Sequence, residues 1–288
     1  FAGYKAGMIQ AVAMDNKKGS LTFGKEVVVP ATVIDTPPML VWGIRVSTRT
    51  VEGLKTLTET WMKNPPKDLE RLTKLPEKFN TEAKVKEIES KIDEIADVRV
   101  LLITQPRLAA GGRKKPELLE VKVGGGSVQE QINYAKKILG KEVKASEIFQ
   151  EGQWLDVMAV TKGKGFQGPV KRWGIAKRPH KSRKTVRGVG SIGPVTPNFV
   201  MRTVPRAGQM GFHRRTEYNK QILSLGEEGE KSTPKGGFVK YGTITGSYLI
   251  LKGSVPGSKK RLITLRHAAR PAATPELFYK IEEINLEH

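Results

Sequence analysis

Hydrophobic residues in the first part of the chain form the short runs that are typical of β-strands. Residues 27–34 are mostly β-branched and end near a Pro-Pro turn, and residues 41–46 form a second apolar run. β-Branched side chains favour extended backbone, and proline interrupts a ladder because it lacks an N–H donor. We therefore expect strands over residues 1–50, followed by an irregular segment over residues 52–80.

Two segments in the middle of the chain have the spacing of amphipathic helices. From Thr81, apolar residues recur at helical intervals through residues 85–95, with Lys and Glu between them. The second helix follows three glycines and begins with the pattern Ser127-x-x-Glu130. This pattern predicts a capping box, in which each side chain accepts the other residue's backbone N–H. Gly140 should end this helix.

Short apolar stretches predict further strands at residues 98–104, 118–123, 154–161, 237–245, 248–252 and 261–266. Short strands with glycine-rich turns are typical of a small β-barrel. The expected fold is mainly β with an α+β insertion, in which a β-barrel is interrupted by a helical region and by a long irregular basic extension. The expected parts are barrel strands at 1–50, an α+β insertion at 51–142 with a barrel strand near 98–104, a barrel strand at 143–165, the extension at 166–219, and barrel strands with a C-terminal tail at 220–288.

Positive charge is concentrated in one segment. The chain has 50 Lys and Arg against 29 Asp and Glu, a net charge of +21. Fourteen of these basic residues lie in residues 157–216, which contain no Asp or Glu; the rest of the chain carries 36 basic and 29 acidic residues. A charge run is often only a solvated face, but solvated faces mix both signs. This acid-free segment would repel itself without a counter-charge, so it predicts a nucleic-acid partner.

Planar side chains are interleaved with these charges: Phe166, Trp173, His180, Phe199, Phe212 and His213. Such groups can stack on unpaired bases, while arginine both stacks and forms paired hydrogen bonds to phosphates. The alternative for Phe166 and Trp173 is that they pack as a local core where the extension begins. Since little apolar surface offsets the entropy of ordering it, we expect the extension to be disordered in the free protein.

Two glycine-rich motifs have an alternative interpretation as nucleotide or anion sites. Gly163-x-Gly165-x-x-Gly168 matches the dinucleotide-binding fingerprint, but we expect no helix to begin at Pro169, and no acidic residue lies about 20 positions further on. These glycines more simply let the backbone approach phosphates. Residues 124–127 could hold an anion at a helix N-terminus, although the capping box already accounts for them.

The sequence offers no catalytic set. Cysteine is absent, and the four histidines have no metal-ligand spacing: His180, His213, His267 and His288. No carboxylate in the acid-free segment could orient a histidine or act as a base. No apolar run approaches the roughly 20 residues of a membrane span. We therefore expect no enzymatic activity, no small-molecule substrate, no membrane partner, and no cofactor beyond structural Mg²⁺ held through RNA.

Several blocks in order along the chain resemble the large ribosomal subunit protein three family. They are residues 1–8, 160–168, 171–174, 207–216, 236–242 and 252–257. The resemblance implies a translation-factor-like β-barrel of the archaeal form. It also implies that the extension runs through ribosomal RNA toward the peptidyl transferase centre. Family members bind near the 3′ end of the large rRNA, act early in subunit assembly and touch neighbouring ribosomal proteins. Family members usually have a basic tail ahead of the Gly3-Tyr4 block, and we expect that this tail is missing from this sequence.

The charge pattern and the resemblance together predict rRNA contacts at Lys5, Lys162, Lys164, Phe166, Gln167, Lys171, Arg172, Trp173, Lys177, Arg178, His180, Lys181, Arg183, Lys184, Arg187, Arg202, Arg206, Gln209, His213, Arg214, Arg215, Lys220, Lys252, Lys259 and Lys260. The extension tip expected near the peptidyl transferase centre is Gly193, Pro194, Val195, Thr196 and Pro197.

The tip departs from the family pattern. Val195 stands where some relatives have a tryptophan in a Gly-x-Trp-x-Pro element, and Val186 lies near the position of a modifiable histidine in eukaryotic relatives. Tryptophan stacking and histidine methylation therefore do not transfer. The expected protein is a structural component of the ribosome in the cytoplasm. The alternatives are a nucleotide-dependent enzyme, a free regulatory RNA-binding protein and a membrane-surface protein.

Overall fold

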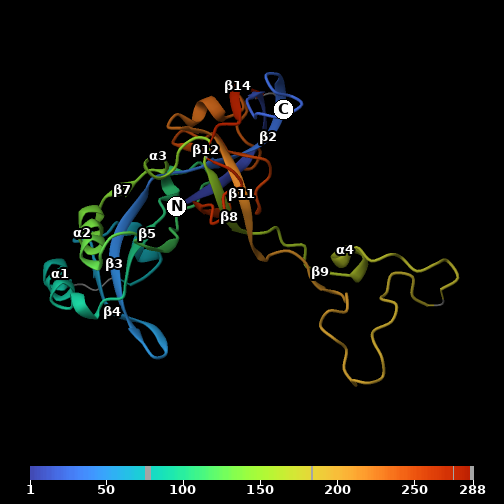
Figure 1. Cartoon of the computed structure of the whole chain (residues 1–288), viewed down its shortest axis with the longest axis horizontal. Helices are drawn as coiled ribbons and strands as arrows, with labels where there is room; N and C mark the ends of the chain where they lie inside the picture. Colours follow the sequence, from blue (N-terminus) through green and yellow to red (C-terminus); the bar gives the residue numbers. More distant parts are fainter. Residues whose placement is uncertain (75–78, 183, 275, 286–288) are drawn as a thin grey trace.

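The computed structural model describes residues 1–74, 79–182, 184–274 and 276–285. The chain is mainly β, as the sequence predicts. It forms a closed sheet, a second sheet covered by helices, and a long arm that projects from the closed sheet (Figure 1).

The closed sheet consists of six antiparallel strands: β1 (Ala2–Asp15), β2 (Glu26–Asp35), β12 (Tyr248–Lys252), β11 (Arg214–Gly226), β8 (Trp154–Val160) and β13 (Leu262–His267). Each strand in this order pairs with the next, and β13 pairs back with β1 through Ala2 to Tyr4. β1 is long enough to hold a second partner, β14 (Tyr279–Asn285), along Gln10 to Asp15. Closure leaves few free edges for pairing with other chains.

Both faces of these strands are apolar. Neighbouring residues of one strand point to opposite faces. Ile34 therefore packs with Leu249 in one cluster, while Val33 packs with Ile250 in another. The segment that follows η4 (Gly229–Ser232) covers the cluster that contains Val33, and it contributes Phe238, Tyr241 and Ile244 to that cluster. The closed sheet is thus a rigid base for whatever extends from it.

The second sheet contains β3 (Met39–Thr50), β4 (Gly53–Trp61), β5 (Asp97–Ile103), β6 (Leu118–Lys122) and the short β7 (Glu142–Val143). One face packs against α1 (Thr81–Ser90), η2 (Ile92–Glu94) and α2 (Val128–Ile138). Part of the other face is covered by η1 (Lys67–Arg71), whose Leu69 is fully buried against Trp42 and Leu101. The short helices η3 (Pro106–Leu108) and α3 (Ala145–Ile148) lie in connections.

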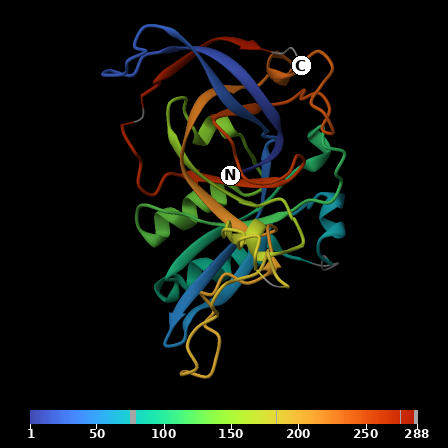
Figure 2. The ribbon, with the colours of Figure 1, turned by 90° about the vertical axis from the view of Figure 1, so that its right-hand side faces the viewer.

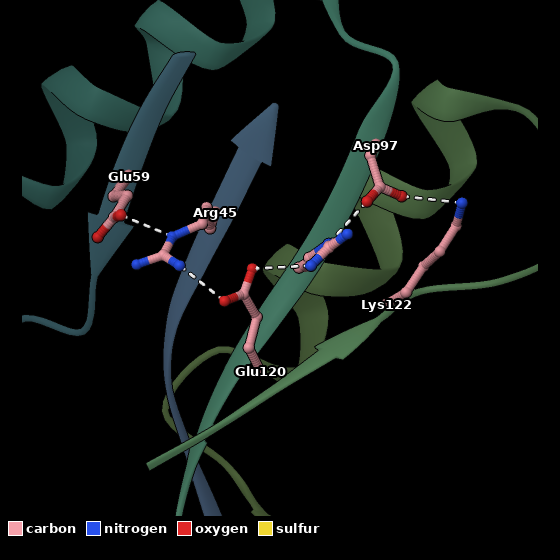
Figure 3. Close-up of polar contacts among 6 residues, drawn as sticks. Arg45, Glu59, Asp97, Glu120 and Lys122 are labelled. Carbon is pink, nitrogen blue, oxygen red and sulfur yellow. Dashed lines mark hydrogen bonds and ion pairs between the residues drawn. The ribbon is translucent and has the colours of Figure 1, made fainter. Parts of the chain in front are cut away.

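The rest of that face carries a chain of ion pairs (Figure 3). Three acidic and three basic side chains alternate along it, in the order Glu59, Arg45, Glu120, Arg99, Asp97 and Lys122. The N–O distances run from 2.6 to 3.3 Å. Their charges cancel, so this face offers no net attraction to a polyanion.

The arm comprises residues 161–213 and continues the hairpin of β8 and β11. Its base is a narrow two-stranded ribbon, β9 (Phe166–Gln167) paired with β10 (Gly208–Gln209), with the short helix α4 (Pro169–Trp173) beside it. Beyond the base, residues 174–205 form the distal loop, which has no helix or strand among its described residues. Figure 2 shows the arm pointing toward the viewer, away from both sheets.

Both predicted helices are present, although α1 ends at Ser90 and the predicted apolar stripe continues through η2 to Ile95. α2 has the Ser127–Glu130 capping box, with both hydrogen bonds present. Gly140 follows it with a φ of +78°, a conformation that glycine adopts without strain. α1 begins at Thr81, and Asn80 caps it by accepting the N–H of Ala83.

Several strand predictions were wrong. Residues 52–80 were expected to be irregular but contain β4, and residues 237–245 were expected to be a strand but hold only an isolated bridge. β14 occupies part of what was expected to be a tail. β3 and β5, expected in the barrel, pair with each other in the second sheet. An apolar run indicates a strand but does not identify its partner.

Two predictions about the extension also need correction. It was expected to end at residue 219, but β11 begins at Arg214 and pairs with β8. No helix was expected at Pro169, yet α4 begins there. Proline is favoured at the first position of a helix because its missing N–H would be unpaired there, and Gly174 ends the helix with a φ of +72°.

Candidate nucleic-acid interface

The base of the arm is ordered by backbone pairing rather than by side-chain packing. Thr161 N donates to His213 O at 2.9 Å, and Lys164 N donates to Met210 O at 2.9 Å. Gly211 has a φ of +72°, and a β-carbon there would lie 2.0 Å from Lys162 O. The two strands can therefore approach this closely only with glycine at position 211.

Two side chains of α4 hold the return strand. Arg172 donates from Nη1 to Arg206 O at 2.9 Å and from Nε to Gln209 O at 3.1 Å. Trp173 Nε1 donates to Arg206 O at 3.0 Å, and the Arg172 guanidinium lies 5.0 Å from the Trp173 ring centroid. Part of each predicted RNA-binding side chain is thus used within the arm, which fixes the orientation of the remainder.

None of the described residues from 161 to 220 is buried. The side chains of Phe166, Phe199 and Phe212 are 77%, 68% and 65% exposed, and that of Trp173 is 52% exposed. Phe166 therefore does not pack as a local core. Exposed aromatic rings on an irregular loop are costly in water and are suited to stacking on bases.

Most predicted contact residues are exposed: Lys162, Lys164, Phe166, Lys171, Trp173, Lys177, His180, Lys181, Lys184, Arg187, Arg202, Arg206, Gln209, Arg214, Arg215 and Lys259. Gln167, Arg172, Arg178, His213, Lys220, Lys252 and Lys260 are half-buried. The tip residues 193–197 are all exposed. Arg183 lies outside the described residues.

Within the distal loop, Arg178 is the main organiser. Its backbone N donates to Val186 O at 2.9 Å, and its Nη2 donates to Val189 O and Gly190 O. The guanidinium therefore closes a turn of the loop upon itself. The other cations of the loop that the structure describes are exposed, and their side chains have no hydrogen bond or ion pair to described residues.

Lys5 is a correction to the predicted site. Its side chain is only 8% exposed, and Nζ donates to the backbone oxygens of Val255 and Gly257. Burial lowers the pKa of Lys5, and the like charges of Lys162 and Lys259 lower it further. Its ammonium fastens a loop rather than facing a phosphate.

Two other predicted residues are partly engaged by the protein. Lys220 pairs with Glu217 at 2.8 Å, and the Lys252 ammonium lies 3.5 Å from the Tyr279 ring centroid. Both are less available to a phosphate than the arm cations.

A groove of about 680 Å³ lies where the arm meets the closed sheet. Its lining includes Lys162, Lys164, Arg172, Trp173 and Gln209 from the arm. The loop of residues 254–257 forms the opposite wall, and Glu217 contributes one carboxylate. A mainly cationic groove next to exposed aromatic rings is suited to a nucleic-acid backbone with accessible bases.

Sequence reasoning missed a second group of exposed lysines: Lys114, Lys115, Lys235 and Lys240. They lie in two loops that are far apart in the sequence, and each is an ordinary surface lysine in its own stretch of sequence. No periodicity or motif marks them, because only the fold brings the loops together.

The described residues contain no cluster of three or more His, Asp or Glu side chains that could hold a metal ion. No helix in the described part of the chain is long and apolar enough to cross a membrane.

A rigid β body with a protruding acid-free arm and no catalytic set is typical of a protein that binds a structured polyanion. A family model described as ribosomal protein L3 matches residues 1–287. The chain therefore belongs to the ribosomal protein L3 family, whose members are structural proteins of the ribosome, so it is not an enzyme.

Relatives in this family are named large ribosomal subunit protein uL3. That of Pyrobaculum calidifontis is 50% identical over 97% of this chain and 86% of its own length. The protein of Methanothermobacter thermautotrophicus is 50% identical over 96% of this chain and 83% of its own length. The protein of Methanocaldococcus jannaschii is 49% identical over 99% of this chain and 84% of its own length. These organisms are archaea, which confirms the predicted archaeal type.

Proposed function

We propose that this protein is a structural component of the large ribosomal subunit that binds the large rRNA through its arm. The observation that supports this most strongly is the arm itself: residues 161–213 contain twelve Lys and Arg, no Asp or Glu, and no buried residue among those described. Such a segment gains little from ordering against its own body, so its order must come from a partner of opposite charge.

The finer proposals follow the family resemblance. The closed sheet acts as a translation-factor-like barrel on the subunit. The rRNA site lies near the 3′ end of the large rRNA, and binding supports early subunit assembly. The tip, around Val195, reaches toward the peptidyl transferase centre. Neighbouring ribosomal proteins contact the body, the protein works in the cytoplasm, and Mg²⁺ takes part only through the rRNA.

Filter binding of the protein to large-subunit rRNA fragments across a salt series tests the central proposal. If about half of the fourteen cations of residues 157–216 meet phosphates, the logarithm of the binding constant should fall by roughly five to six units per tenfold rise in salt. A matched variant in which a short Gly-Ser linker replaces the distal loop should lose about half of this slope, because the loop carries seven of the fourteen cations. Absence of binding, or a slope near zero for the intact chain, would refute the proposal.

A further inference from the structure

Three loops that are far apart in sequence meet beside the base of the arm. They are residues 105–116, 233–247 and 253–261. A β-carbon at Gly111 would lie 3.6 Å from the Tyr241 ring and 4.0 Å from the Lys260 side chain. Lys259 Nζ donates to Val239 O at 3.0 Å. The loops therefore form one continuous surface, which we name the three-loop surface.

The three-loop surface accounts for the rest of the positive charge. Its loops contain nine Lys and Arg and no Asp or Glu. Of the 50 basic residues, fourteen lie in residues 157–216 and nine in these loops, which leaves 27 basic against 29 acidic residues elsewhere. The remainder of the chain is thus slightly negative. All of the net positive charge lies in the acid-free segment and the three-loop surface.

Most of these cations have no carboxylate partner. Arg107 pairs with Asp68 at 2.6 Å, and Arg113 pairs with Glu117 at 3.0 Å. The lysines that form no ion pair within the described part of the chain are Lys114, Lys115, Lys235, Lys240, Lys259 and Lys260. All are exposed except Lys260, which is half-buried. Their charges are uncompensated, in contrast to the alternating ion pairs of the second sheet (Figure 3).

A buried side chain beneath the three-loop surface holds two of its loops in place. The Asp35 carboxylate is fully buried, and its Oδ2 accepts the Tyr241 hydroxyl at 2.8 Å and the Ala110 N–H at 3.3 Å. One side chain therefore fastens two of the loops. Lys240 and Lys260 have φ values of +66° and +69°. Non-glycine residues in this region are strained, and such strain is found preferentially at functional sites.

The three-loop surface is continuous with the arm. A β-carbon at Gly257 would lie 3.4 Å from Val160 O, directly before the arm begins. Arg261 donates from Nη1 to Val160 O at 3.3 Å, and its guanidinium lies 5.6 Å from the exposed Phe212 ring. A polyanion in the groove at the base of the arm can thus pass onto the loops without leaving basic surface.

We propose that the three-loop surface is a second phosphate-binding site, which docks a segment of RNA backbone beside the segment bound by the arm. The proposal rests on the rRNA-binding function proposed above. The composition favours RNA over a protein partner, because protein interfaces are depleted in lysine, and among the described residues of these loops only Leu108 and Val239 are large apolar residues with exposed side chains. Lysines act as point charges that position a backbone without reading its sequence.

The test is the salt dependence of binding to large-subunit rRNA fragments by the full chain. The variant Lys114→Gln/Lys115→Gln/Lys235→Gln removes three charges from two of the loops. Each lost phosphate contact lowers the slope by about 0.7 to 0.9, so the slope should fall by about two units. The matched control Lys55→Gln/Lys86→Gln/Lys137→Gln removes three exposed lysines from the β3–β4 hairpin, α1 and α2 and should keep the wild-type slope.

The outcomes separate the two proposals. Absence of binding by the wild-type chain refutes rRNA binding as a whole. Steep wild-type binding with an unchanged slope in the loop variant refutes the three-loop site and leaves the arm as the interface. An equal decrease of the salt slope in the loop variant and in the control also refutes the three-loop site, because it indicates that binding responds to net charge alone. Circular dichroism and thermal unfolding of each variant establish that it is folded.

Discussion

Burial divides the ionisable residues of this protein into two kinds with different roles. Most of the described arm cations are exposed and have few protein partners, so their contribution depends on a ligand. Lys5 and Asp35 are buried and fasten loops: Lys5 through the backbone oxygens of Val255 and Gly257, and Asp35 through Tyr241 and Ala110. Sequence reasoning placed Lys5 among the RNA contacts because residue type reveals charge but not burial.

Asp35 should make the stability of the protein depend on pH. Burial raises the pKa of its carboxyl to about 6, above the value near 3.9 of an unfolded chain. The folded state therefore binds the proton more tightly. The stabilisation that protonated Asp35 gives to the folded state is complete below about pH 4. It is lost as pH rises to about 6, which lowers the free energy of unfolding by up to about 3 kcal/mol. Urea unfolding of Asp35→Asn should show no such loss between pH 4 and 7.

Asp15 provides a control, because the pH dependence that it gives to stability has the opposite sign to that of Asp35. Hydrogen bonds from Thr22, Ser20 and the Lys17 N–H lower the pKa of its carboxyl. Its contribution is therefore present at neutral pH and is lost as pH falls through the folded-state pKa. Asp15→Asn should flatten the acid side of the stability profile and leave the Asp35 region intact. A wild-type slope between pH 4 and 6 that persists in Asp35→Asn would contradict this assignment.

Local signals predicted single elements well and their partners poorly. α2 is specified by Ser127, Glu130 and Gly140, all of which act within one turn of the helix ends, so the sequence is sufficient. β4 was missed because Thr and charged residues alternate along an edge strand, and this pattern resembles a polar loop. The pairing of β1 with β13 closes the sheet between residues that lie more than 250 positions apart in the sequence. The periodicity of apolar residues does not encode such a pairing.

Prediction of the candidate RNA-binding surfaces from the sequence has the same limit: local signals are found, and spatial neighbours are not. The arm was predictable because its twelve cations lie within one continuous acid-free segment of the sequence. The three-loop surface was not, because its nine cations are divided among three loops that only the fold assembles. Lys259 and Lys260 were predicted through the family motif beside them, whereas Lys114 and Lys240 carry no local signal.

The two parts of the arm should differ in amide hydrogen exchange of the free protein. At the base, residues 161–167 and 208–213 pair through their backbones, so their exchange should be slowed. The distal loop has few backbone hydrogen bonds and no buried residue among those described, so most of its amides should exchange at nearly the unfolded rate. Strong protection across residues 175–205 would show that the free arm is ordered by itself.

The molecule as a whole consists of a body that is complete in itself and an arm that adds nothing to the body's core. The closed sheet has its own apolar clusters, and the second sheet has a third beneath α1 and α2. Figure 1 shows the distal loop far from both sheets. The arm should therefore be dispensable for folding, although we propose that it is essential for binding.

Removal of the distal loop tests this division. Trp173 Nε1 donates to Arg206 O at 3.0 Å, so the backbone ends left by excising residues 174–205 lie about one side-chain length apart and a short Gly-Ser linker can join them. The loop buries no described residue, and changes at such surface positions typically alter stability by less than about 0.5 kcal/mol. The melting temperature should therefore stay within about 2 °C of the intact chain, because about 1 kcal/mol corresponds to 2–4 °C in a protein of this size. A drop of about 10 °C would show that the arm supports the body, and the loss of RNA binding by the same variant could then no longer be assigned to missing contacts.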